Sequence, residues 1–237
     1  QEHAERYEYN AVRVYQELVP LGYERGYEAV KRFVRGLRPK KGRHAFMRIE
    51  TPPGRQAQVD WGEFKKVRLG SAVVDLHFFC MTLSWSRVIE GLWLLREDLL
   101  TLERAHLTIF RRWGGIPQRL RYDNMKTVVQ SGQGIKAVWN RGFLGFARSC
   151  GFKPEACHVK SPFEKGKVES SIDYVRHNFF PGRQTGSLEA LQNQFDDWNK
   201  TIARRRIHGT TYERPLDRFL KEQPLLQTLP AVLPEPV

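Results

Sequence analysis

The sequence lacks any apolar run near the roughly 20 residues that a membrane-spanning helix needs. It contains only three cysteines, and none of them has the paired spacing typical of a zinc site or a disulfide framework. Its seven histidines are scattered, so no His/Cys cluster indicates a tetrahedral metal site either. These absences argue against a membrane protein and a disulfide scaffold, and we expect reduced thiols in a cytoplasmic protein.

Positive charge is what the sequence has in excess. Lysine and arginine number 39 against 26 aspartates and glutamates, which gives a formal net charge of +13. Hydrophobic residues make up 41% of the 237 residues and aromatics 12%, enough to fill the core of a globular protein. A basic globular chain without a membrane span favours nucleic acid over anionic lipid as its partner.

The first forty residues have the apolar spacing of two short helices. The apolar positions are Val12, Tyr15, Leu18 and Val19, then Tyr27, Val30, Phe33, Val34 and Leu37. A turn over residues 20–26, with two glycines, separates them and predicts a helix-turn-helix domain over residues 1–38. No acid occurs from Lys31 to Ile49, so the second helix and the chain after it could neutralise DNA phosphates. The candidate DNA contacts are Lys31, Arg32, Arg35, Arg38, Lys40, Lys41 and Arg43. An ordinary helical hairpin with a solvated basic face is the alternative.

A basic linker rich in proline and glycine follows over residues 39–55, and the pattern then changes to strands. Apolar and polar residues alternate from position 56, with two further apolar stretches at 73–83 and 88–95. Helical patterns at 99–113, 140–150 and 168–179 alternate with short strands at 119–122 and 154–159. This order predicts an α/β domain over residues 56–183, a ribonuclease H-like mixed sheet flanked by helices.

The remaining residues are expected to form a helical extension over residues 184–222 and a proline-rich linker over 223–237. The chain begins with Gln1 rather than methionine, so we interpret it as a piece of a longer protein that continues beyond this linker.

Three acids occupy positions that such a sheet would bring together. Asp60 lies on the first strand, on the face opposite Val59 and Trp61, and Asp123 ends the fourth strand, where ligands of open α/β sheets gather. Glu169 falls within the repeat of the last helix, whereas its rival Glu164 precedes that helix. A carboxylate cluster of this kind suits phosphodiester chemistry, because two Mg²⁺ ions can stabilise the attacking and leaving oxygens together.

Other polar and basic residues are candidate DNA contacts because they flank these acids or form a basic run. They are Asn124, Lys165, Lys167, Arg204, Arg205 and Arg206. For the three consecutive arginines, a solvated basic turn is an equal alternative.

Motifs along nearly the whole chain, in order, resemble the IstA-type transposases of bacterial insertion sequences, within the DDE or retroviral-integrase superfamily. The matching segments are Gly22-Tyr23, residues 30–34, Pro52-Pro53-Gly54, residues 58–62, Ser86-Arg87, residues 113–117, Tyr122-Asp123-Asn124, Ser161-Pro162, residues 165–169, residues 208–211 and Arg214-Pro215. The acids alone are shared by many integrases, but their combination with the Pro-Pro-Gly and Gly-Thr-Thr segments is more specific.

The resemblance implies that Asp60, Asp123 and Glu169 are the catalytic, metal-binding triad of an enzyme that cleaves element ends and joins their 3′ hydroxyls to target DNA. It also implies double-stranded DNA as substrate, two Mg²⁺ ions for which Mn²⁺ can substitute, and a homodimer or higher oligomer on paired ends. Upstream DNA-binding helices, a downstream β-barrel, an AAA+ ATPase helper called IstB and a place at the bacterial nucleoid are further implications.

Two other functions fit parts of the pattern. One is a nuclease of the same fold that cuts without joining, which has less need of a helix-turn-helix to recognise sequence. The other is a DNA-binding regulator with an inert catalytic fold, which the intact set of three acids disfavours.

Overall fold

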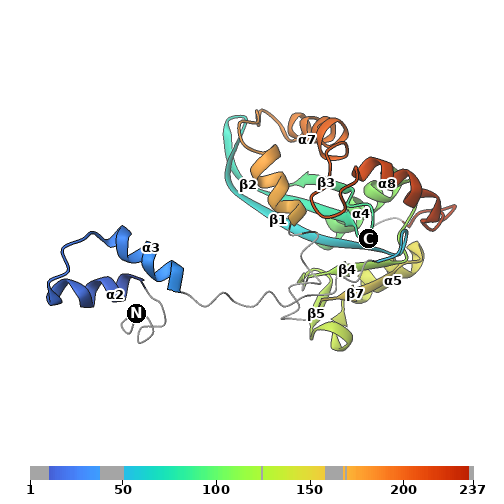
Figure 1. The fold of residues 1–237 in the computed structure, drawn as a ribbon. Helices are drawn as coiled ribbons and strands as arrows, with labels where there is room; N and C mark the ends of the chain where they lie inside the picture. The colour runs from blue at the N-terminus through green and yellow to red at the C-terminus, as the bar shows by residue number, and fades with distance from the viewer. Residues whose placement is uncertain (1–10, 38–50, 124, 158–167, 169, 235–237) are drawn as a thin grey trace. The chain divides into compact units, whose positions relative to one another are not determined.

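The computed structural model describes residues 11–37, 51–123, 125–157, 168 and 170–234. The chain divides into two compact units, residues 1–48 and 49–237, each of which is described by itself (Figure 1). Among the described residues, no helix combines the length and the apolar character needed to cross a membrane.

The first unit contains the two expected helices. They are α2 (Ala11–Leu18) and α3 (Tyr27–Leu37), with the short 3-10 helix η1 (Val19–Leu21) after α2. Gly22 ends η1 in the left-handed conformation, with a φ of 87°. Val14 of α2 packs with Val30 and Val34 of α3. Phe33, one of the apolar positions of the expected second helix, is 59% exposed, whereas Val30 and Val34 are buried.

The second unit is built on a five-stranded sheet in the order β3-β2-β1-β4-β7. Its strands are β1 (Gln56–Leu69), β2 (Ala72–Leu83), β3 (Ile89–Leu94), β4 (Arg119–Tyr122) and β7 (Lys153–Ala156). β1, β2 and β3 pair antiparallel, whereas β4 runs parallel to both β1 and β7. The mixed sheet predicted from the order of the elements is therefore confirmed.

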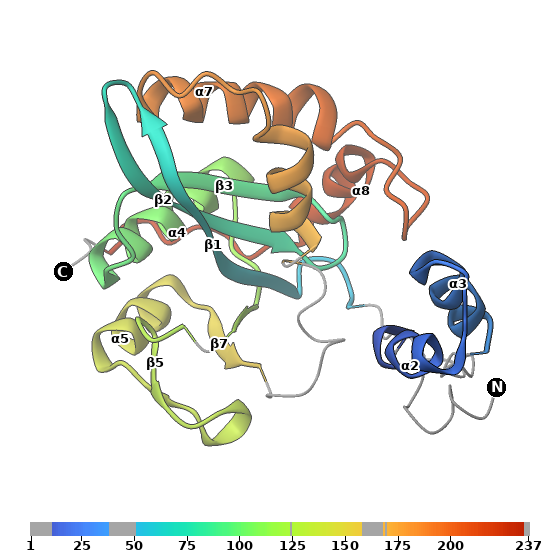
Figure 2. The same ribbon diagram turned by 90° about the vertical axis from the view of Figure 1, so that its left-hand side faces the viewer.

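Helices cover both faces of this sheet, and each face has its own core. One core packs the sheet against α4 (Leu99–Trp113) and α5 (Arg141–Cys150), and includes Val59 and Tyr122. The other packs it against the helical residues 168 and 170–174, the π-helical turn η3 (Val175–Phe179) and α7 (Leu188–Trp198), and includes Phe64 and Ile172. Figure 2 shows α7 above the sheet and α5 below it.

Side-chain amides satisfy the outer backbone groups of the edge strand β3. Gln192 of α7 accepts from the Trp93 N–H at 2.9 Å and donates to the Gly91 carbonyl at 3.1 Å. Asn199 donates to the Ile89 carbonyl at 2.8 Å. Because an edge strand with free backbone groups invites pairing with another chain, these amides protect β3.

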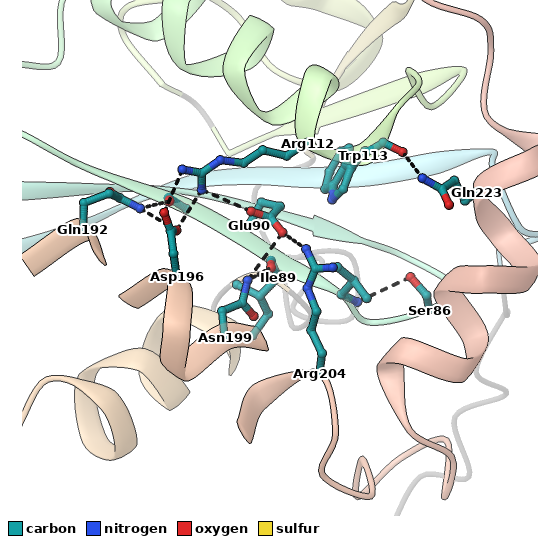
Figure 3. A network of polar contacts seen from close by, with 12 residues as sticks. Ser86, Ile89, Glu90, Arg112, Trp113, Gln192, Asp196, Asn199, Arg204 and Gln223 are labelled. Atoms are coloured by element: carbon teal, nitrogen blue, oxygen red, sulfur yellow. Dashed lines mark hydrogen bonds and ion pairs between the residues drawn. The ribbon is translucent and has the colours of Figure 1, made fainter. Parts of the chain in front are cut away.

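A buried carboxylate on β3 joins elements from both faces. Glu90 is 2% exposed and forms ion pairs with Arg112 of α4 and with Arg204, which follows the π-helical turn η4 (Asn199–Ala203) (Figure 3). Arg112 also binds Asp196 of α7 through two hydrogen bonds of 2.9 Å. Burial raises the pKa of Glu90, and the two arginines oppose that shift. Arg204, one of the predicted DNA contacts, therefore forms an ion pair with the buried Glu90.

A small hairpin between β4 and α5 was not predicted. Its strands β5 (Val129–Ser131) and β6 (Val138–Trp139) flank the 3-10 helix η2 (Gly134–Lys136). Strands this short have no detectable alternation, so their sequence reads as a loop. Gly132 at the turn has a φ of 74°, and a Cβ there would lie 2.1 Å from the Lys136 carbonyl oxygen, so only glycine fits.

The C-terminal segment packs onto the sheet unit, although its composition suggested a linker. Ile116 and Gln227 exchange two backbone hydrogen bonds of 2.9 Å, and Leu226 is buried in the first core. Glu222, the last residue of α8 (Pro215–Glu222), is fully buried and accepts from the Gly54 and Ser86 N–H groups at 2.9 and 3.0 Å. Residues 223–227 are thus part of the folded unit.

Candidate active site

Two of the three predicted carboxylates lie side by side. The parallel pairing of β1 and β4 places Val59 opposite Tyr122, so the next residues, Asp60 and Asp123, follow at matching positions. Neighbouring strands are about 4.8 Å apart. These two aspartates, 63 positions apart in the sequence, therefore meet where β4 ends.

Both aspartates belong to the same face of the sheet. Val59 and Tyr122 pack into the core beneath α4 and α5, and side chains alternate along a strand. Asp60 and Asp123 are therefore on the opposite face, the one covered by the helical residues 168 and 170–174. Gly62, two residues after Asp60, confirms this orientation, because a Cβ on it would lie 2.8 Å from the Ile172 side chain.

The Asp60 carboxylate is half-buried, so it keeps access to solvent. Its Oδ1 accepts a hydrogen bond from the Trp61 N–H at 2.8 Å, which restrains the carboxylate. Trp61 itself points to the other face, where its ring packs edge-on against Phe79 at a centroid distance of 4.9 Å. Asp123 is also half-buried.

The helical residues 168 and 170–174 are attached directly to β1 and β2. The Val168 N–H donates to the Gln58 Oε1 at 3.1 Å, and Gln58 precedes Asp60 by two residues on the same face. The Thr82 hydroxyl donates to the Ser171 Oγ at 2.9 Å. Glu169, the third predicted acid, and its rival Glu164 lie outside the described residues.

A buried histidine supports the strand that ends at Asp123. His106 of α4 is fully buried, and its Nδ1 donates to the Leu102 carbonyl at 2.8 Å. A neutral imidazole has one donor and one acceptor, so its Nε2 accepts from the Tyr122 hydroxyl, also at 2.8 Å. Burial lowers the pKa of His106 to about 4, which keeps the ring neutral at pH 7.

Other acids of the sheet unit form local interactions. Glu155 of β7 forms ion pairs with Arg119 and Arg121 of β4, at 3.2 and 3.3 Å. Glu63 pairs with Lys65 at 3.1 Å, and Asp173 pairs with Arg176 at 3.1 Å. Asp75 accepts from the Lys66 N–H at 2.8 Å.

The predicted DNA contacts have different surroundings. Lys31, Arg32 and Arg35 are exposed on α3, where Lys31 forms an ion pair with Glu28 at 3.0 Å. Arg206 packs over the Tyr174 ring at 3.8 Å, and of the three consecutive arginines only Arg205 is exposed. Seven of the predicted DNA contacts lie outside the described residues: Arg38, Lys40, Lys41, Arg43, Asn124, Lys165 and Lys167.

The donor chemistry of the site fits a hard divalent cation. Asp60 and Asp123 offer carboxylate oxygens, the ligands that Mg²⁺ prefers, at the end of a strand where ligands of α/β sheets bind. Within the described part of the chain, no three His, Cys, Asp or Glu side chains form a group able to hold a metal ion. A complete site of the predicted kind needs Glu169 as well.

The sequence of the chain was compared with those of known proteins. No protein-family model matches the chain. Over 94% of its length, it is 30% identical to the transposase for insertion sequence element IS21 of Pseudomonas aeruginosa and 34% identical to a transposase of Aminobacter aminovorans. This chain is a homologue of insertion-sequence transposases. The resemblance seen in its motifs is thereby confirmed.

The chain spans about half the length of these relatives, covering 57% of the Pseudomonas aeruginosa protein and 45% of the Aminobacter aminovorans protein. Its fold is that of integrase catalytic cores. The HTLV-2 integrase catalytic core domain, solved in complex with magnesium, superposes with a TM-score of 0.51 at 14% identity, over 70% of this chain and 97% of that one.

A second solved structure shows the same fold. A chain in the simian T-cell lymphotropic virus intasome, solved in complex with PP2A regulatory subunit B56 gamma, also gives a TM-score of 0.51, at 17% identity. The superposition covers 77% of the chain described here and 59% of the chain from the intasome. The ribonuclease H-like fold predicted from the sequence is confirmed.

Three supporting residues were not predicted from the sequence: Gln58, His106 and Glu222. Gln58 lies two positions before Asp60 in a strand with alternating faces, so the pattern could have indicated it as a residue on the same face. His106 and Glu222 lie in helical patterns where no spacing distinguishes a buried polar residue from an exposed one.

Proposed function

We propose that this chain is the core of a DDE transposase, an enzyme that hydrolyses phosphodiester bonds at element ends and joins the freed 3′ hydroxyls to target DNA. The observation that carries the proposal is the juxtaposition of Asp60 and Asp123 on one face of neighbouring strands, in a homologue of insertion-sequence transposases. The fold it shares with integrase cores supports the same chemistry.

In this proposal Asp60, Asp123 and Glu169 hold two Mg²⁺ ions, for which Mn²⁺ can substitute. When bound, such a pair of cations lowers the pKa of water and stabilises the attacking and leaving oxygens of an in-line displacement. Carboxylate oxygens are the ligands that these cations prefer, and the hydrogen bond from Trp61 holds Asp60 in one orientation. Gln58 acts as a positioning residue, because its side chain accepts from the N–H of Val168, the neighbour of Glu169.

The exposed cations of α3 would bind the DNA backbone, as in a helix-turn-helix whose second helix enters the major groove. Cutting and joining at two ends would require a homodimer or higher oligomer. A helper ATPase of the IstB kind and association with the bacterial nucleoid complete the proposal, by likeness to the family alone.

A branched DNA substrate that mimics the joined product tests this function without knowledge of the element ends. A DDE transposase resolves such a branch by the reverse of joining, and does so with Mg²⁺ or Mn²⁺ but not with a chelator. A nuclease without joining activity would cut this DNA without forming the resealed strand, and an inert regulator would bind it unchanged. Either result would overturn the proposal.

Metal binding gives a second readout that does not depend on catalysis. Calorimetric titration of the chain with Mn²⁺ alone should show binding that Asp60→Asn and Asp123→Asn each weaken. The matched control is Glu155→Gln, because Glu155 lies on the same face but pairs with Arg119 and Arg121. An equal loss of Mn²⁺ affinity in Asp60→Asn, Asp123→Asn and Glu155→Gln would argue against this metal site.

A further inference from the structure

The hairpin of β5 and β6 follows closely on Asp123. Its first strand begins at Val129, six residues after that aspartate. The base is fixed to the sheet unit: the Asn140 N–H donates to the Val128 carbonyl at 2.8 Å, and the Thr127 hydroxyl donates to the Glu97 carbonyl at 3.1 Å. The Trp139 ring lies edge-on to the Tyr122 ring at a centroid distance of 6.0 Å. The hairpin is thus anchored beside the residue that precedes Asp123.

Two apolar side chains of this hairpin are exposed. Ile135 is 94% exposed, and Val138 is 51% exposed. Figure 2 shows the light-green hairpin reaching outward beside α5, and Figure 1 shows the same projection from another side. The glycine-built turn gives the tip a defined shape, since Gly132 approaches the backbone of Lys136 too closely for any side chain.

The charge of the surrounding segment is of one sign. Between Asp123 and Glu155 the sequence contains five basic residues and no acidic one. All five side chains are exposed: Lys126, Lys136, Arg141, Arg148 and Lys153. Scattered exposed apolar residues are normal on protein surfaces. An isoleucine on a projecting, acid-free hairpin that carries Lys136 and has Lys126 and Arg141 at its base has instead the composition of an element that enters DNA.

We propose that this hairpin is a DNA-binding arm, in which Ile135 inserts between stacked bases while Lys136 of the hairpin and Lys126 and Arg141 at its base bind the flanking phosphates. This inference rests on the proposed function, because it places the DNA near the end of β4, where Asp123 follows Tyr122. A two-stranded ribbon fits the major groove, and apolar wedges such as isoleucine unstack base steps in proteins that distort DNA. Local unstacking would open the duplex end that the carboxylates must reach.

The test uses the whole chain without divalent ions, so that no DNA is cleaved. The probe is a short duplex with 2-aminopurine beside a nick, because this base becomes more fluorescent when it unstacks. The chain should raise the emission at saturation, Ile135→Ala should abolish the rise, and Ile135→Leu should restore it. Ile207→Ala is the matched control, since Ile207 is 60% exposed on a different loop and should leave the emission unchanged.

Affinity measured over a salt series tests the phosphate contacts. Lys126→Gln, Lys136→Gln and Arg141→Gln should each weaken binding and lower the slope of log K against log salt by about one. An unchanged emission rise in Ile135→Ala, or an unchanged salt slope in all three charge variants, would overturn the inference. If Asp60→Asn and Asp123→Asn still resolve branched DNA, the proposed function fails instead, so the two failures are distinguishable.

Discussion

The Tyr122 hydroxyl donates a 2.8 Å hydrogen bond to the Nε2 of His106, one residue before Asp123. His106 lies in the middle of α4 and is surrounded by aromatic rings, including Phe110 and Phe152. The end of β4, and with it the position of Asp123, therefore depends on a polar contact inside an otherwise apolar core. This contact makes the candidate site sensitive to a residue that touches neither metal nor DNA.

Replacing His106 should destabilise the fold and disturb the site. In His106→Phe the buried Tyr122 hydroxyl loses its acceptor, which costs about 1–3 kcal/mol of unfolding free energy. Urea denaturation measures this loss. His177→Gln is the control, because His177 is exposed and should change the unfolding midpoint little. An equal midpoint for His106→Phe and the unsubstituted chain would contradict the role given to this hydrogen bond.

The same histidine predicts how stability depends on pH. Its folded-state pKa of about 4 lies below the ordinary value of 6.5, so the unfolded chain binds a proton first as the pH falls. The stabilisation is complete above about pH 6.5 and is lost between there and pH 4, with a total of about 3 kcal/mol. As the pH is lowered through this range, the unfolding free energy should decrease less in His106→Phe than in the unsubstituted chain, because the variant has no imidazole at this position. If the unfolding free energies of the two proteins changed equally with pH, His106 would not be the cause of the pH dependence.

Substitution of the candidate catalytic acids should separate chemistry from binding. Asp60→Asn, Asp123→Asn and Glu169→Gln each remove a charged oxygen ligand with little change in volume, so we expect cleavage and joining to fall to the level seen without metal. DNA binding and the unfolding midpoint should stay near those of the unsubstituted chain. Glu164→Gln should reduce cleavage and joining much less. Near-normal joining by any of the first three would remove that residue from the metal site.

The exposed cations of α3 should contribute to DNA affinity through phosphate neutralisation. Lys31→Gln, Arg32→Gln and Arg35→Gln, made in the whole chain, should each weaken duplex binding and reduce its salt slope by about one. Fluorescence anisotropy over a salt series provides the measurement. Arg68→Gln, an exposed substitution on β1, is the control. An affinity that is flat from low to physiological salt would contradict this prediction.

Glu222 should be more important for stability than a single surface acid. It accepts from the buried N–H groups of Gly54 and Ser86, so Glu222→Ala leaves both without an acceptor, at about 1–3 kcal/mol each. Glu222→Gln retains one amide oxygen and should cost less. The exposed Glu189 offers the control variant Glu189→Gln. A Glu222→Ala protein with an unchanged unfolding midpoint would show that the C-terminal segment packs independently of this carboxylate.

Several features of the fold could be predicted because they depend on local pattern. Alternation along β1 predicted the face of Asp60, since side chains on a strand point to opposite sides with a period of two. The helical repeat of Val168, Ile172, Val175 and Phe179 predicted a buried stripe, and all four are buried. The motif resemblance was also correct, and transposase relatives confirm it.

Other features could not be predicted because they depend on which surfaces meet. The pattern included Phe33 among the apolar positions of α3 without telling which of them are buried, and its side chain is exposed. The hairpin of β5 and β6 has strands too short for alternation. Proline-rich composition indicates irregular backbone, yet it does not tell whether that backbone packs, and here Leu226 fills a site next to the sheet.

The sequence by itself determined the five strands of the main sheet, the long helices and the excess of positive charge, because propensity, periodicity and ionisation are properties of neighbouring residues. Only the tertiary structure decided that Asp60 and Asp123 lie together. It also decided that Glu222 accepts a hydrogen bond from Gly54 of the Pro-Pro-Gly segment and that Arg204 forms an ion pair with Glu90. The reason is physical. Each of these contacts joins residues far apart in the chain, and they meet only after burial of the two apolar faces has aligned the sheet with its helices.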